Sequence, residues 1–127
     1  MLEQNALVIV ADGEQAILYR NTSADGIELS EVERLSPKNL ADESEGNAPQ
    51  GRTPRQEDEA TFAKQLAERL NALVLRHKAG QVAIIADPTT LGTMRKHYHK
   101  ELEAVLVRQL AKDLTNASPA EVAKALS

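Results

Sequence analysis

Three aspartates are the first candidates for chemistry, because each of them ends a predicted strand. Asp12, Asp87 and Asp113 would lie together if the ends of those strands converge. Their carboxylate oxygens could then hold a divalent cation, since hard cations prefer oxygen ligands, and a metal site of this kind indicates phosphodiester cleavage. The stronger interpretation is structural: Asp12 begins a turn, Asp87 ends a strand ahead of Pro88, and Asp113 caps a turn or helix. We therefore expect no metal and no cofactor.

A dense group of basic residues is the second candidate. Its members are Arg95, Lys96, His97, His99 and Lys100. On a single helix, residues 95 and 99, and residues 96 and 100, would stack one turn apart. A solvated helix face explains such a group; the sharper hypothesis is that Arg95, Lys96, His99 and Lys100 contact phosphate or RNA. A zinc site made by these histidines with His77 is disfavoured, because a spacing of two suits a strand and not this helix.

A long connection over residues 36–53 is the third candidate. It carries two prolines, two glycines and no apolar periodicity. Loops of such length are usually functional or disordered. An ordered functional loop would present five residues to a partner: Asn47, Gln50, Gly51, Arg52 and Arg55. The arginines either pair with the surrounding acidic residues, at under about 1 kcal/mol for each exposed pair, or contact nucleic acid.

The elements that position these residues follow from hydrophobic patterning. The apolar run over residues 6–11 predicts a strand buried on both faces, and an Asp-Gly turn leads from it into a second strand at 15–20. A third and more exposed strand is expected over 27–35. These segments predict an antiparallel meander.

A long helix is expected over residues 54–78. Thr53 can cap it, Pro54 suits its first position, and Gln56 completes a capping box. Gly80 is expected to end it. Its last turn would then carry three basic residues: Arg76, His77 and Lys78.

The second half of the chain alternates strands and helices. Residues 81–86 read as another buried strand, and a helix follows from Thr89 or Thr90. Residues 100–110 fit either a continuation of that helix or a strand; we favour a strand at about 103–110. Ser118 opens a short last helix. The order β-β-β-α-β-α-β-α predicts a single α/β domain over 1–127, with a five-stranded mixed sheet between helices in three layers.

Composition excludes several classes of function. The 127 residues include no cysteine, which excludes a disulfide framework, a thiolate zinc site and a cysteine nucleophile. Motifs of P-loop nucleotide binding, α/β-hydrolases and zincin proteases are absent. A net charge of −4 argues against strong non-specific DNA binding. The apolar run at 6–11 is too short for a signal peptide or a membrane span, so we expect a cytoplasmic protein without membrane insertion.

Three segments, in this order and at this spacing, resemble the bacterial host attachment protein family: residues 8–13 with Ala16, 84–88 with Leu91, Gly92 and Arg95, and 112–115. The resemblance covers nearly the whole chain, includes the motif positions Asp12, Asp87, Pro88 and Asp113, and supports the strand at 103–110. It implies a role in attachment to host cells, which would be indirect for a cytoplasmic protein.

The element order is also similar to the ribonuclease-H-like middle domain of archaeal and eukaryotic release factors and of Pelota. Those domains carry a Gly-Gly-Gln loop that promotes ester hydrolysis on the ribosome. The corresponding loop here, residues 46–52, has Ala48 and Pro49 ahead of Gln50 and Gly51. Proline cannot adopt the positive φ that glycine allows, so we do not expect direct peptide release.

Two functional hypotheses result. The first is a non-catalytic binding module of the host attachment family with an unknown protein partner. The second is a translation-associated factor that binds the ribosome or tRNA through residues 46–55 and the basic group. Neither hypothesis requires enzyme activity, and the aliphatic sheet edges leave homodimerisation open.

Overall fold

The computed structural model describes residues 2–37 and 55–127, with side chains from residue 59 on in the second segment. Its elements are β1 (Leu7–Ala11), β2 (Ala16–Asn21), β3 (Leu29–Leu35), α2 (Arg55–Leu75), β4 (Val82–Ala86), α3 (Pro88–Arg95), α4 (Lys100–Val105), β5 (Leu106–Ala111) and α5 (Pro119–Leu126). The sheet has five strands in the order β3-β2-β1-β4-β5. β1 pairs antiparallel with β2 and parallel with β4, and β5 is parallel to β4. The predicted mixed sheet is confirmed.

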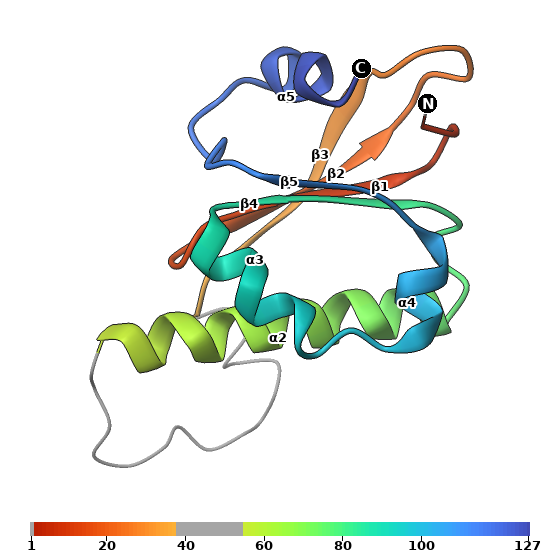
Figure 1. Cartoon of the computed structure of the whole chain (residues 1–127). Coiled ribbons are helices and arrows are strands. Elements are labelled where there is room, and N and C mark those ends of the chain that lie inside the picture. Colours follow the sequence, from red (N-terminus) through yellow and green to blue (C-terminus); the bar gives the residue numbers. More distant parts are fainter. Residues whose placement is uncertain (1, 38–54) are drawn as a thin grey trace.

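Helices cover both faces of the sheet. Figure 1 shows α2, α3 and α4 on one face and α5 on the other. β1 and β4 are buried along their whole length, as their continuous apolar runs predict. β3 lies at one edge of the sheet and is mostly exposed, as its alternating sequence predicts.

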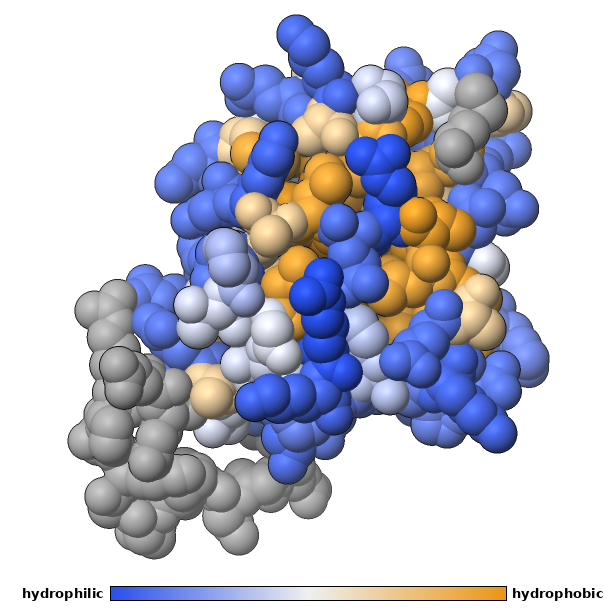
Figure 2. Space-filling model, in the orientation of Figure 1, coloured by the Kyte–Doolittle hydropathy of each residue, from blue (hydrophilic) through white to orange (hydrophobic). Residues whose placement is uncertain are grey.

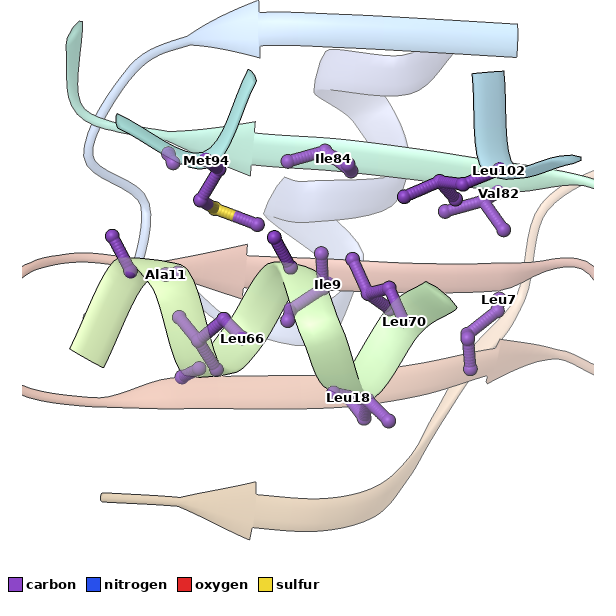
Figure 3. Close-up of a cluster of buried hydrophobic side chains, with 14 of the residues drawn as sticks. Leu7, Ile9, Ala11, Leu18, Leu66, Leu70, Val82, Ile84, Met94 and Leu102 are labelled. Atoms are coloured by element: carbon purple, nitrogen blue, oxygen red, sulfur yellow. The ribbon is translucent and has the colours of Figure 1, made fainter. Parts of the chain in front are cut away.

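The two faces hold two separate cores, because successive side chains of a strand point to opposite sides. Leu7 and Ile9 of β1 pack in the core beneath α2, whereas Val8 and Val10 pack in the core beneath α5. Figure 3 shows Leu66 and Leu70 of α2 facing the strand side chains of the first core. The larger core therefore fixes α2 across the middle of the sheet.

The end of α2 differs from the prediction. The helix ends at Leu75, and His77, not Gly80, takes the left-handed conformation with φ of 61°. The N–H of Lys78 donates to the carbonyl of Leu73 at 2.9 Å, and that of His77 to the carbonyl of Val74 at 2.9 Å. These two bonds close the helix by a Schellman motif, so the three basic residues at 76–78 follow the helix instead of lying in its last turn.

The ambiguous stretch after α3 is part helix and part strand. α4 occupies Lys100–Val105 and β5 begins at Leu106, so the strand expected at about 103–110 starts three residues later than predicted. Leu106 pairs with Val82, the first residue of β4. Register with β4 thus sets the start of β5. Within the described residues, no helix is both long enough and apolar enough to cross a membrane.

Candidate functional site

The predicted aspartates lie at one end of the sheet, where the parallel strands have their carboxyl ends. Asp12 follows β1, Asp87 follows β4, and Asp113 lies two residues after β5. Leu35, the last residue of β3, pairs with Ala16, so β3 also ends at this end of the sheet. The chain after β3 therefore leaves the sheet close to the aspartates.

A threonine hydroxyl joins two of the three aspartates. Thr115 Oγ1 lies 3.0 Å from Asp12 Oδ2 and 2.9 Å from Asp113 Oδ1. The hydroxyl has one proton to donate, so the two carboxylates share it. Thr115 is only 5% exposed, whereas Asp12 is partly exposed and Asp113 is exposed, so the link is partly buried. It ties the segment after β5 to the segment after β1, although β4 lies between those strands.

Each aspartate also has a local structural role. Asp12 Oδ1 accepts the backbone N–H groups of Glu14 and Gln15 at 2.7 and 2.8 Å, which shapes the β1–β2 turn. Asp87 caps α3, where its Oδ2 accepts the N–H of Thr90 at 3.1 Å. Its buried Oδ1 has no hydrogen-bond partner among the described residues. The structural interpretation of the aspartates therefore accounts for most of their oxygens.

The described residues contain no group of three or more histidine, aspartate or glutamate side chains placed to hold a metal ion. The structure links Asp12 with Asp113, but it does not add Asp87 to that pair. This end of the sheet therefore carries a hydrogen-bonded Asp12–Thr115–Asp113 arrangement.

The first turns of α2 pack directly against the β1–β2 turn. A Cβ atom added at Gly13 would lie 2.7 Å from Cδ and 2.9 Å from Cγ of Glu59. A side chain at position 13 would therefore have to displace the flexible side chain of Glu59. Sequence reasoning assigned Gly13 to a tight turn only, because the neighbour across the interface is distant in sequence.

The basic group does not form one helix face, so the predicted stacking of residues 95 with 99 and 96 with 100 is wrong. α3 ends at Arg95 and α4 begins at Lys100, with His99 as its N-cap. The residues between form a connector, Lys96–His99, and the four candidates Arg95, Lys96, His99 and Lys100 are all exposed. Arg95 Nε donates to Oε1 of Gln109 on β5 at 3.1 Å, which leaves its other N–H groups to a partner.

Asn71 fixes this connector to α2, and sequence reasoning missed it. Its Nδ2 donates to the carbonyl of His97 at 2.9 Å, and its Oδ1 accepts the N–H of His99 at 2.9 Å. A single side chain thus satisfies two backbone groups where the chain turns. The available signal was an asparagine next to the apolar stripe inside a helix, where its propensity is poor.

Tyr98, within the connector, packs its side chain against the core beneath α2. Burial raises the pKa of its phenol to about 12. The hydroxyl lies 3.5 Å from Gln109 Oε1, in a cavity of about 320 Å³ that Arg95 and Glu103 also line. The ring therefore stays neutral at physiological pH, and the charged groups of this cavity are Arg95 and Glu103.

The predicted loop candidates lie almost entirely outside the described residues. These are Asn47, Gln50, Gly51 and Arg52. Arg55 is described in its backbone only, as the first residue of α2. Their role in binding stays a prediction.

Comparison with known proteins relates nearly the whole chain to one protein family. Residues 5–126 match a family described as bacterial archaeo-eukaryotic release factor family 12. A solved structure titled "Archaeal protein" is similar, with a TM-score of 0.55 and 17% identity over 96% of this chain. The match covers 34% of that protein, so this chain spans about a third of its length. A search of curated proteins finds no match.

Proposed function

Because the chain belongs to bacterial archaeo-eukaryotic release factor family 12, we propose that it acts in translation by binding the ribosome or a tRNA. The family match over residues 5–126 is the observation that carries the proposal. It supports the second of the two functional hypotheses. The role in host attachment stays a prediction that the comparisons do not support.

The exposed connector between α3 and α4 is the surface that suits RNA best. The connector and the residues on either side of it carry the cations Arg95, Lys96 and Lys100, and basic side chains are common contacts of phosphate. His99 lies beside them, and its Nδ1 accepts the N–H of Glu101. Asn71 holds the backbone of the connector through His97 and His99, so these side chains project from a fixed backbone. A fixed surface binds with a smaller loss of conformational entropy than a mobile one.

Binding on this proposal does not include peptide release. The loop that matches the Gly-Gly-Gln position has Ala48 and Pro49 ahead of Gln50. The protein would therefore occupy a release-factor-like position, or hold a tRNA, without hydrolysing the ester. Arg52 and Arg55 are the proposed additional contacts from the loop.

Co-sedimentation with ribosomes tests the proposal. We expect the protein to pellet with ribosomes at low salt, and to dissociate as salt rises. Lys96→Gln with Lys100→Gln removes two of these cations. It should reduce the steepness of the plot of log binding constant against log salt concentration by about 1.4 to 1.8, if each lysine contacts one phosphate. Arg52→Ala with Arg55→Ala should weaken binding in the same way.

The matched control is Lys64→Gln with Lys112→Gln, which makes the same change of charge at exposed lysines elsewhere. It should bind as the native chain does. A native protein that stays in the supernatant at low salt, with free tRNA also unbound, would reject the proposal. Equal loss in the control and connector variants would reject the connector as the site.

A further inference from the structure

A groove beside α5 takes no part in the proposed function. It has a volume of about 550 Å³ and lies between α5, β5 and the turn that joins β2 to β3. Small-molecule sites typically measure about 300–1,000 Å³. Figure 2 shows apolar side chains exposed among hydrophilic ones on the face of the molecule that it displays. The groove thus has both the size and the mixed surface of a ligand site.

The apolar part of the groove comes from two elements. α5 contributes Ala120, Ala123 and the buried Leu126, and the β2–β3 turn contributes Ile27. The two alanines present only methyl groups, so the space beside the helix is left unfilled. An extended hydrocarbon chain fits such a surface, because burying it removes apolar area from water.

Two cations complete the lining. Arg108 of β5 donates from Nη1 to the carbonyl of Leu126 at 3.4 Å, which holds its guanidinium near the end of α5 and leaves other N–H groups unused. Lys124 is exposed and has no ion pair among the described residues. Both therefore remain able to bind an anion.

Two acidic residues close to the groove in sequence, Glu121 and Asp25, have partners elsewhere. Glu121 accepts the N–H of Ser118 at 2.8 Å, at the other end of α5. Asp25 accepts the hydroxyl of Ser23 at 3.1 Å. Neither of them lines the groove. Arg108 and Lys124 are thus the charged side chains that line the groove.

We propose that this groove binds a small amphipathic anion, with its hydrocarbon chain against Ala120, Ala123 and Ile27 and its carboxylate held by Arg108 and Lys124. The proposal is independent of ribosome or tRNA binding. It names a class, the medium-chain carboxylates, by the pairing of an apolar surface with two cations.

Titration with decanoate below its micelle-forming concentration, followed by amide NMR of the full chain, tests this. Decanoate should shift the amides of Ile27, Ala123 and Leu126 in a saturable manner. Acetate supplies the charge without the chain and should shift none of them. Decanol supplies the chain without the charge and should bind at least about threefold more weakly, the effect of one partly exposed ion pair.

Variants separate the two parts of the site. Ala123→Leu places a larger side chain in the groove and should weaken binding, and Ala120→Leu serves in its place if that variant does not fold. Lys124→Gln should weaken decanoate about threefold. Lys64→Gln, an equal change of charge on the opposite side of the sheet, should leave affinity unchanged. Equal affinity for decanol and decanoate, or native affinity in both leucine variants, would overturn the proposal.

Discussion

The Asp12–Thr115–Asp113 arrangement shows how one residue can join distant parts of the chain. Thr115 is buried, and its hydroxyl lies within 3.0 Å of both carboxylates. Because the carboxylate oxygens of Asp12 and Asp113 accept hydrogen bonds from Thr115, the arrangement acts as a structural link. It gives the aspartates at two of the strand ends a structural role.

Replacing that hydroxyl should weaken the link. Thr115→Val removes the donor but keeps the shape, and we expect the free energy of unfolding to fall by about 1 kcal/mol. The loss of free energy is no larger than this because Asp12 is partly exposed and Asp113 is exposed, so water can replace the donor. Chemical denaturation measures it. Thr115→Ser keeps the hydroxyl and should stay closer to native; if it falls as far as the valine variant, packing and not the hydrogen bond is responsible.

The α3–α4 connector shows what decides local structure between elements. The basic sequence at 95–100 is compatible with a continuous helix, yet the helix ends at Arg95. His99 then begins α4 by accepting the N–H of Glu101 through Nδ1 at 3.0 Å. Asn71 satisfies the backbone groups that the break leaves free. Tertiary hydrogen bonds from α2 thus stabilise a break that local propensity does not require.

Loss of Asn71 should therefore loosen the connector before it affects the core. In Asn71→Ala the amide of His99 loses its acceptor, and its hydrogen exchange should accelerate by about tenfold, the effect of a hydrogen bond worth about 1.4 kcal/mol. Amide exchange measured by NMR tests this, with the buried residues of β4 as internal reference. Asn71→Asp keeps the acceptor for His99 and should protect that amide better than alanine does. Unchanged exchange at His99 in the alanine variant would contradict the role assigned to Asn71.

At the scale of the whole molecule, one sheet separates two cores of different construction. α2, α3 and α4 cover one face, and α5 with the segment before it covers the other. Each core has a tyrosine: Tyr19 beneath α5 and Tyr98 at the edge of the core beneath α2. Burial raises the pKa of both phenols above the ordinary value of 10.0. The ionisation of the two tyrosines therefore reports on the cores on both faces of the sheet.

Alkaline pH should destabilise the fold through these phenols. The folded state keeps their protons at a pH where the unfolded chain releases them, so stability falls as pH rises above about 10. The shift for Tyr98, to about 12, places its window between 10 and 12. Denaturation at pH 8 and 11 should show a decline that is smaller in Tyr98→Phe. Absorbance of tyrosinate near pH 10 in the folded protein, at the level of free tyrosine, would contradict this.

Much of this architecture follows from the sequence because it depends on short-range pattern. The unbroken apolar runs of β1 and β4 identify buried strands, and the capping box at Ser118 predicts the start of α5, where Glu121 and Ser118 bond reciprocally. The predicted order of elements suggested a similarity to release-factor domains, and the family match over residues 5–126 supports that similarity. Local propensity and periodicity are properties of neighbouring residues, so they can be read from the chain directly.

Only the tertiary structure decided the rest, because those features join residues far apart in the chain. The link from Thr115 to Asp12 spans 103 positions, and the bond from Asn71 to His99 spans 28. Close approach of Glu59 to Gly13 and the groove between Arg108 and α5 depend likewise on how strands and helices are stacked. No local pattern encodes such partners: they become neighbours only when burial of the two cores places the elements against each other.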